Sequence, residues 1–347
     1  MRINGRGLNF VIIGENIHTT RIVLRNGKLV TTSPEGVESV QYTAVNREKR
    51  YLAIPERIKN GQDYQEGRVK HVKIAVLAGM AGEQEGIEYL HAMVQRQVAA
   101  GADFLDLNVD EISIKPEEQK NAMRWLVRTV EPLSPIPLSI DSSNIEIIEA
   151  GLDACEGRAG RPMLNSASLE RLDALNLAAS SRFPVVVTAA GESGMPQNTE
   201  QRVQNASRMV NASLEKGIPK QDIYIDALVF PISVDSQFGN HCLDAFRQLR
   251  ETYGPEIHIT GGLSNVSFGL PLRRLINDVF INLSVDAGAD SGIIDPVAGK
   301  LDHVFSLDKQ SKPYQLAEDV LLGRDKNCKT FLRAYRKGEL QMAASGA

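Results

Sequence analysis

The chain has 347 residues, of which 42% are hydrophobic and 24% are charged, with a formal net charge of −4. These values are typical of a soluble globular protein, and the weak negative charge with only 5% aromatic residues argues against a nucleic-acid partner. No apolar run is long enough for a transmembrane helix, and the N-terminus lacks the apolar core of a secretory signal. Because Cys155, Cys242 and Cys328 form no CxxC pair, we expect reduced thiols, a cytoplasmic location and no membrane partner.

Short apolar runs alternate with amphipathic segments from Gly101 onward, and this order predicts a parallel sheet. An additional strand at 9–14, whose helix follows late at about 83–100, completes an α/β fold of the (β/α)8 TIM-barrel class. The seven later strands are expected at 104–109, 137–141, 162–165, 184–188, 222–226, 256–260 and 291–294. Their helices are expected at about 117–131, from 143 or 144, from about 168, and at about 199–216, 238–253 and 271–287.

The late first helix reflects a long insertion, Thr19–Gly82, in the first βα loop. Within it, Asn26-Gly27 separates two β-prone runs and predicts a hairpin. Barrel active sites form on the face that carries this loop, so the insertion is a candidate lid or docking element; a solvated decoration or an oligomer contact is the alternative. We expect one barrel domain over 1–347, with a C-terminal helical tail at 300–347.

Polar side chains recur at the carboxyl ends of the predicted strands. In the second strand, alternation sends Asp106 and Asn108 into the barrel, while Leu105, Leu107 and Val109 face the helices. Burying carboxylates together costs roughly several kcal/mol each unless a ligand or a network satisfies them, so the recurrence predicts a site for a polar ligand. The other members of this series are Glu15, Asn16, Ser139, Asp141, Asn165, Tyr224, Asp226, Ser264, Asn265 and Asp295.

The chemistry of these side chains favours one kind of ligand. Carboxylates accept the paired N–H donors of a guanidine-like edge, and an Asn side chain pairs with an amide-like edge. A pterin carries both edges in one fused ring, so the series predicts a pterin site.

Six stretches, in order between Phe10 and about Pro296, resemble the pterin-binding methyltransferases. These are the methyltetrahydrofolate–corrinoid protein methyltransferases and the folate module of cobalamin-dependent methionine synthase. Two positions depart from the family pattern: His18 stands where Asn is usual, and Phe268 where a polar residue is common. The stretches are Gly14–Ile17 (GENI), Leu105–Val109 (LDLNV), Ser139–Asn144 (SIDSSN), Leu164–Ser166 (LNS), Tyr224–Asp226 (YID) and Gly262–Ser267 (GLSNVS).

The resemblance implies a homodimeric TIM barrel that moves a methyl group between tetrahydrofolate or methyltetrahydrofolate, as substrate, and the cobalt of a corrinoid. The corrinoid is free or carried by a corrinoid protein partner, the direction of transfer is open, and the chain holds no tightly bound metal of its own. The predicted catalytic residues are Asn265, beside the nitrogen that carries the methyl group, and Asp226. The pterin-binding residues implied by motif are Asp141, Asn165, Asp226, Asn265, Asp106, Asn108, Ser264 and Glu15.

Methyl transfer from a tertiary amine requires a proton at the leaving nitrogen. The amide of Asn265 does not titrate near neutral pH, so we expect it to accept a hydrogen bond from the protonated nitrogen. The proton is expected from solvent or from a water held by a nearby Asp.

Three other functions compete with this interpretation. A dihydropteroate synthase-like enzyme shares the barrel and the pterin pocket, but its Ser-Arg-Lys element is replaced here by Ser264-Asn265-Val266. A metal-dependent aldolase or hydrolase needs clustered His ligands, whereas for His18 and His258 packed or hydrogen-bonding roles are favoured. A non-catalytic pterin-binding subunit of a methyltransferase complex has no need of a complete polar series.

Overall fold

The computed structural model describes residues 9–299 and 301–340. Eight strands form one sheet in the order β12-β11-β10-β9-β8-β7-β1-β13, and β12 and β13, at the two ends of this order, also pair in parallel through Gly262 and Ile293. This strand order and pairing confirm the predicted (β/α)8 barrel class. The chain divides into two compact units: Gly14–Asn165, called here the N-terminal unit, and Met1–Ile13 with Ser166–Ala347, the C-terminal unit.

In the N-terminal unit, barrel strands alternate with helices as predicted. Helix α5 buries Met123, Leu126 and Val130 at helical spacing, and α6 starts at Asn144, whose side chain accepts the N–H of Glu146 at 2.9 Å. The barrel elements are β1 (Val11–His18), α3 (His71–Met80), α4 (Gln84–Ala99), β7 (Phe104–Asn108), α5 (Pro116–Val130), η1 (Glu131–Leu133), β8 (Leu138–Asp141), α6 (Ile145–Leu152) and β9 (Met163–Ala167), with β1 and β9 shared between the units.

Strand β1 extends to His18, beyond the predicted end at Gly14. The main chain stays extended because Asn16 N donates to Gln97 Oε1 at 3.1 Å and Thr19 N donates to the carbonyl of Asn108 at 3.0 Å. A Cβ on Gly14 would collide with Gln97 Oε1, so a larger residue there would displace the amide that accepts the N–H of Asn16. The extension carries His18 to the carboxyl end of β7.

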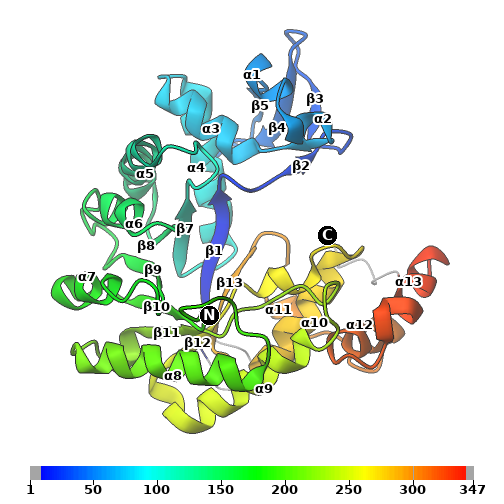
Figure 1. The fold of residues 1–347 in the computed structure, drawn as a ribbon. Helices are drawn as coiled ribbons and strands as arrows, with labels where there is room; N and C mark the ends of the chain where they lie inside the picture. The colour runs from blue at the N-terminus through cyan, green and yellow to red at the C-terminus, as the bar shows by residue number, and fades with distance from the viewer. Residues whose placement is uncertain (1–8, 300, 341–347) are drawn as a thin grey trace. The chain divides into compact units, whose positions relative to one another are not determined.

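The predicted hairpin at Asn26-Gly27 is wrong. Leu24 lies in a strand that pairs with Arg68–Val69, while Val30 pairs with Val40 in a separate three-stranded sheet. That sheet buries one apolar face, whereas two short runs paired only with each other would bury almost nothing. Figure 1 shows its strands gathered with α1 and α2. The elements of the insertion are β2 (Val23–Leu24), β3 (Val30–Thr32), β4 (Glu38–Thr43), β5 (Lys49–Ala53), α1 (Glu56–Lys59), α2 (Gln62–Gln65) and β6 (Arg68–Val69).

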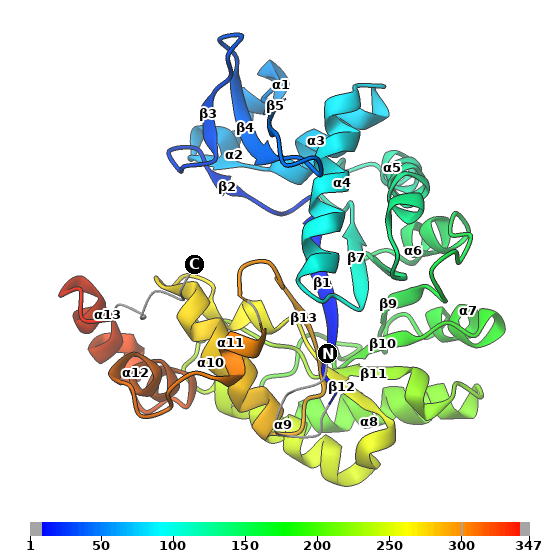
Figure 2. The same ribbon diagram turned by 180° about the vertical axis from the view of Figure 1, so that it is seen from behind.

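The C-terminal unit continues the same alternation. Val185, Val186 and Val187 of β10 are all fully buried, as expected for a parallel strand covered on both faces, and α8 and α9 pack side by side (Figure 2). The first helix of the unit begins at Ala174, later than the predicted 168. The elements are α7 (Ala174–Ser181), β10 (Val185–Thr188), α8 (Thr199–Glu215), η2 (Lys220–Asp222), β11 (Ile223–Asp226), α9 (Phe238–Tyr253), η3 (Gly254–Glu256), β12 (His258–Thr260), η4 (Leu263–Ser267), α10 (Arg273–Asp286) and β13 (Ser291–Ile294).

The described part of the predicted tail is helical and comprises α11 (Leu301–Phe305), α12 (Lys312–Leu321), η5 (Lys326–Cys328) and α13 (Lys329–Arg336). Lys300 and residues 341–347, which the tail prediction also covers, lie outside the described residues. Among the described helices, none combines the length and the apolar character that crossing a membrane requires.

A buried carboxylate fixes the loops that lead into β8 and β9. Glu131, only 6% exposed, accepts main-chain N–H groups from Glu156 at 2.9 Å, Gly157 at 2.7 Å and Arg158 at 3.3 Å. Charge-assisted hydrogen bonds of this kind are about twice as strong as neutral ones. Glu131 therefore stabilises the two strands that end in the polar residues described below.

We expect Glu131→Ala to lower the free energy of unfolding by about 2–4 kcal/mol, because it leaves several buried N–H groups without an acceptor. Urea unfolding followed by circular dichroism measures this change. The matched control is Glu117→Ala on α5, which removes an exposed carboxylate of an i,i+3 ion pair and should change stability little. Equal losses for the two variants would contradict the assigned role.

Candidate functional site

Three polar residues lie side by side at the carboxyl ends of neighbouring strands in the N-terminal unit. Asn108, Asp141 and Asn165 are register partners across β7, β8 and β9, so their side chains leave the same face of the sheet. We call them the N-terminal polar row. Asn108 Nδ2 donates to Asp141 Oδ2 at 2.8 Å. The row brings together three of the predicted pterin-binding residues.

Asp106 lies beneath this row and is completely buried. Its Oδ1 accepts a hydrogen bond from Asn165 Nδ2 at 3.3 Å, a contact that spans β8 and places Asp106 on the same face as the row. Its Oδ2 is 2.8 Å from His18 Nε2. Because an ionised carboxylate only accepts hydrogen bonds, the imidazole donates from Nε2. Asp106 thus joins β1 to the polar row.

The close spacing of these charges changes their protonation. Burial lowers the pKa of His18, but the hydrogen bond to Asp106 and the charges of Asp106, Asp141 and Glu15 outweigh it, so the pKa is raised. Burial and the nearby charge of Asp106 raise the pKa of Asp141, with His18 and Asn108 opposing this shift. Both shifts favour the protonated forms of His18 and Asp141.

A bound divalent cation would also compensate the negative charges of such a cluster. The ligand atoms of His18, Asp106 and Asp141 lie within 4.8 Å of one another, which is compatible with a metal in composition and spacing. However, the hydrogen bond between His18 Nε2 and Asp106 Oδ2 already joins two of the atoms that would coordinate it.

A second polar row lies in the C-terminal unit. Thr188, Asp226 and Thr260 are register partners across β10, β11 and β12, and we call them the C-terminal polar row. Asp226 Oδ1 accepts the N–H of Leu228 at 2.8 Å. Burial raises the pKa of Asp226 to about 6, although the Leu228 hydrogen bond and the charge of Arg202 lower it. A raised pKa in a carboxyl group at a strand end is typical of a functional site.

The loop after Asp226 is held by a buried cation. Arg202 is fully buried; it donates to the carbonyls of Leu228 at 3.4 Å and Asn198 at 3.1 Å, and its guanidinium lies 4.8 Å from the centroid of the Phe230 ring. Leu228 has a φ of +65°, which is uncommon for a residue other than glycine. Local strain is therefore stored beside Asp226 and maintained by Arg202.

Asn265 lies in the 3₁₀ turn η4 that follows β12. Its main-chain N donates to the carbonyl of Gly262 at 3.0 Å, and a Cβ at Gly262 would lie 2.7 Å from Asn265 Nδ2. Glycine at 262 is therefore required for the Asn265 amide to fold back over the chain. Arg273 Nη2 donates to the carbonyl of Ser264 at 2.9 Å, so the turn that presents Asn265 is fixed from α10.

Other polar residues of the predicted series have local partners. Asp295 caps the N–H groups of Val297 and Ala298, each at 3.0 Å. His258 pairs with Asp290 at 2.9 Å, which confirms the hydrogen-bonding role expected of it. Glu15 on β1 accepts from Arg21 at 3.2 Å.

Sequence reasoning did not identify several of these residues as part of the site. No sequence motif identifies Thr188 or Thr260 as part of the site, and nothing in the local sequence indicates that Arg202 is buried beside it. His18 did carry a signal, since it departs from the family pattern at the end of β1.

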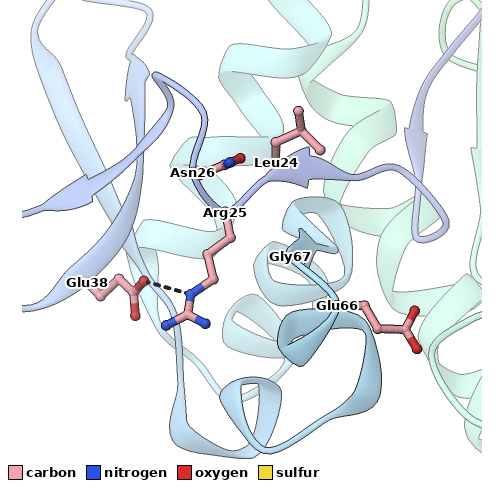
Figure 3. A pocket seen from close by; sticks show the side chains of 6 residues that line it. All are labelled: Leu24, Arg25, Asn26, Glu38, Glu66 and Gly67. Atoms are coloured by element: carbon pink, nitrogen blue, oxygen red, sulfur yellow. Dashed lines mark ion pairs between the residues drawn. The ribbon is translucent and has the colours of Figure 1, made fainter. Parts of the chain in front are cut away.

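A pocket of about 660 Å³ lies within the insertion, away from the predicted site residues (Figure 3). The guanidinium of Arg25 lines this pocket, and its Nε lies 3.7 Å from Glu38 Oε1. This cation of the pocket is therefore already paired with a carboxylate. The pocket is lined by Leu24, Arg25, Asn26, Glu38, Glu66 and Gly67.

In a comparison with protein families, residues 81–295 match the pterin binding enzymes. The chain belongs to this family. The match covers the strands that carry both polar rows and ends at Asp295. The membership indicated by the six sequence stretches is thereby confirmed.

Curated relatives of this pterin binding enzyme include corrinoid- and folate-related proteins. The chain is 30% identical to the methylcorrinoid:tetrahydrofolate methyltransferase of Eubacterium limosum over 263 residues, or 74% of this chain and 91% of that protein. It is 32% identical to the methionine synthase of Mycobacterium leprae (strain TN) over 213 residues, or 57% of this chain but only 17% of that longer protein.

Solved structures of dihydropteroate synthases share its fold. The enzyme from Xanthomonas albilineans in complex with 7,8-dihydropteroate superposes with a TM-score of 0.51 at 21% identity, over 63% of this chain and 83% of that one. The enzyme from Stenotrophomonas maltophilia gives a TM-score of 0.52 at 21% identity, over 64% and 86%. At this level of identity the likeness concerns the fold alone.

The raised pKa of Asp226 predicts that the free energy of unfolding depends on pH. Because the folded-state pKa of about 6 lies above the ordinary value of 3.8, ionisation destabilises the folded state, and stability falls as pH rises between these values. We expect Asp226→Asn to raise the free energy of unfolding at pH 7 by about 1–2 kcal/mol and to leave it unchanged near pH 3.5. Chemical denaturation at both pH values measures this. Asp244→Asn, which removes an exposed carboxylate on α9, is the control, and no gain for Asp226→Asn at pH 7 would contradict the assignment.

Proposed function

We propose that this pterin binding enzyme is a methyltransferase that moves a methyl group between a tetrahydrofolate-type pterin and the cobalt of a corrinoid. The observation that carries the proposal is its likeness to a methylcorrinoid:tetrahydrofolate methyltransferase over 91% of that protein's length. The two polar rows support it, because they present the acceptors and donors that a pterin ring requires. Tetrahydrofolate and the corrinoid are both substrates in this reaction.

In the proposed complex, Asp141, Asn165 and Asp226 bind the pterin ring. An ionised carboxylate accepts two N–H donors from the guanidine-like edge, and an Asn side chain satisfies the amide-like edge. Such pairing also compensates the carboxylates for lost hydration, which is why their burial is tolerated. Asp106, Asn108, Glu15 and Ser264 complete the polar surroundings.

Asn265 is proposed to serve the nitrogen that carries the methyl group. When the methyl leaves for cobalt, the carbon–nitrogen electron pair stays on nitrogen, which requires a proton there. The Asn265 carbonyl accepts a hydrogen bond from the protonated nitrogen and stabilises it as charge develops. The turn geometry supports this role, since Gly262 and Arg273 hold the amide in one place.

We further propose that the enzyme works in the cytoplasm as a homodimer with a corrinoid protein partner, and that it holds no resident metal; the family resemblance supports these points. Size-exclusion chromatography with light scattering tests the homodimer, and elemental analysis tests whether the protein holds a resident metal.

The dihydropteroate synthase alternative has weaker support. The element expected of that enzyme is replaced by Ser264-Asn265-Val266, and Arg273, a cation at this edge, is engaged with Ser264 and Ser267. A non-catalytic pterin-binding subunit would bind tetrahydrofolate without transferring a methyl group, so the methyl-transfer assay distinguishes it from the proposed enzyme.

The reaction itself is tested by mixing the protein with methylcobalamin and tetrahydrofolate and following loss of the methyl–cobalt absorption band. We expect Asn265→Ala to lower the turnover rate about 100-fold or more while changing tetrahydrofolate affinity by less than about threefold, because its hydrogen bond forms mainly in the transition state. Calorimetry gives the affinity. Equal losses in rate and affinity would contradict the transition-state role, and absence of pterin binding by the unmodified protein would overturn the proposal.

The insertion is proposed to serve as a lid or docking element. It begins directly after His18, and Thr19 Oγ1 accepts the N–H of Glu111 at 3.2 Å, which ties its base to the end of β7. It also exposes apolar side chains, among them Leu24 at 60%. Exposed apolar residues at such a place favour contact with a partner.

If the insertion docks the corrinoid protein, Leu24→Glu should raise the apparent KM for that protein several-fold without changing the rate with free methylcobalamin. Steady-state kinetics with both substrates tests this. Leu172→Glu, at a 39% exposed leucine of the C-terminal unit, is the matched control. An unchanged KM in Leu24→Glu would instead favour a solvated decoration.

A further inference from the structure

We propose that His18, held by Asp106, is the acid–base residue that exchanges a proton with the methyl-bearing nitrogen of the pterin. The proposal rests on the proposed methyl transfer and names a group that supplies the proton. His18 stands where the family resemblance implies Asn, whose side chain cannot exchange a proton near neutral pH.

The first argument is the orientation of the imidazole. Nε2 donates to Asp106 Oδ2 at 2.8 Å, which fixes the ring and its tautomer. Among the described residues, Nδ1 of the same ring has no hydrogen-bond partner. One nitrogen is therefore anchored by a carboxylate while the other is available, which is the arrangement used by Asp–His pairs in acid–base catalysis.

The second argument is the depth of the two side chains. Asp106 is fully buried, whereas the His18 side chain is 13% exposed. The carboxylate thus lies beneath the ring, and the ring reaches the surface of the N-terminal unit at the carboxyl end of β1. The hydrogen bond between the imidazole and a carboxylate buried in this way is stronger than the same bond in water, because solvent does not compete for it.

The third argument is proximity to the N-terminal polar row. The ligand atoms of His18 and Asp141 lie within 4.8 Å of each other, and Asp106 also binds Asn165 of that row. A pterin held by Asp141 and Asn165 therefore binds next to the imidazole. Direct contact or one intervening water is sufficient for proton transfer over such distances.

The charged surroundings favour the protonated form of the ring. Within the N-terminal unit, the ionisable groups that act on His18 are Asp106 on β7, Asp141 on β8 and Glu15 on β1, all acidic. Arg21 pairs with Glu15, and Asp110 acts on Asp141. The acidic groups outweigh the effect of burial, so the pKa of His18 is raised.

The proton then balances the transfer in either direction. When methyl moves to cobalt(I), the nitrogen–carbon bond breaks, its electron pair remains on nitrogen, and Nδ1–H gives its proton to that nitrogen. When methyl moves from methyl–cobalt(III) to the pterin, the amine attacks the methyl carbon and its N–H proton passes to Nδ1. In the first case cobalt(I) donates an electron pair to the methyl carbon. In the second case the cobalt–carbon bond breaks and its electron pair stays on cobalt.

The experiment compares the unmodified protein with His18→Gln and His18→Asn. Single-turnover methyl transfer from methylcobalamin to tetrahydrofolate is followed between pH 5 and 9, and tetrahydrofolate affinity is measured by calorimetry. We expect both variants to bind tetrahydrofolate within about threefold of the unmodified protein and to transfer methyl about 100-fold more slowly, with the pH dependence due to His18 removed. His91→Gln on α4 is the matched control and should keep the original rate and profile.

Two further measurements exclude a merely structural role. In protein labelled with ¹⁵N-histidine, the His18 imidazole should titrate above 6.5, and Asp106→Asn should lower that value. Adding imidazole to His18→Ala should restore part of the lost rate, because a free base can enter the space left by the ring.

Several results would overturn the proposal. These are an unchanged rate and pH profile in His18→Gln, equal losses of rate and affinity, or a stoichiometric divalent cation that is lost with His18 and is needed for transfer. Inactivity or absence of pterin binding in the unmodified protein would instead overturn the proposed function, so the two failures are distinguishable. The NMR titration still decides whether His18 holds a proton.

Discussion

A carboxylate as deeply buried as that of Asp106 requires hydrogen-bond donors, because removing an unpaired charge from water costs roughly several kcal/mol. The N-terminal unit supplies these donors from two other strands, through His18 on β1 and Asn165 on β9. Supplying the first donor requires β1 to extend to His18, and the hydrogen bond from Asn16 N to Gln97 Oε1 supports that extension. The geometry of the polar row therefore follows from satisfying one charge.

The C-terminal unit meets the same constraint by different means. Asp226 receives one main-chain N–H, from Leu228, and a buried cation, Arg202, acts at longer range. This compensation is incomplete, so the carboxyl group keeps a raised pKa and Leu228 keeps an unfavourable φ. Incomplete compensation at a strand end is what a site needs if a ligand is to supply the missing donors.

The sequence predicted the barrel because each strand–helix repeat carries its own periodicity, as in the buried run Val185–Val187 and the amphipathic α5. Strand alternation likewise placed Asp106 on the inner face. Contacts between distant segments left no such signal: the pairing of β2 with β6, the extension of β1 toward Gln97, and the position of Arg202 all depend on which segments meet after folding. The sequence showed that His18 departs from the family pattern, but it did not show that Asp106 is its hydrogen-bond partner.

The incomplete compensation of Asp226 also affects how long the protein survives. The raised pKa of Asp226 means that its ionisation lowers the stability of the protein, and any ligand that binds only the folded form stabilises the protein by mass action. At about one hundred times its dissociation constant, such a ligand adds roughly 2.7 kcal/mol. Proteases act on the unfolded population, so the lifetime of this protein would increase with its supply of substrate.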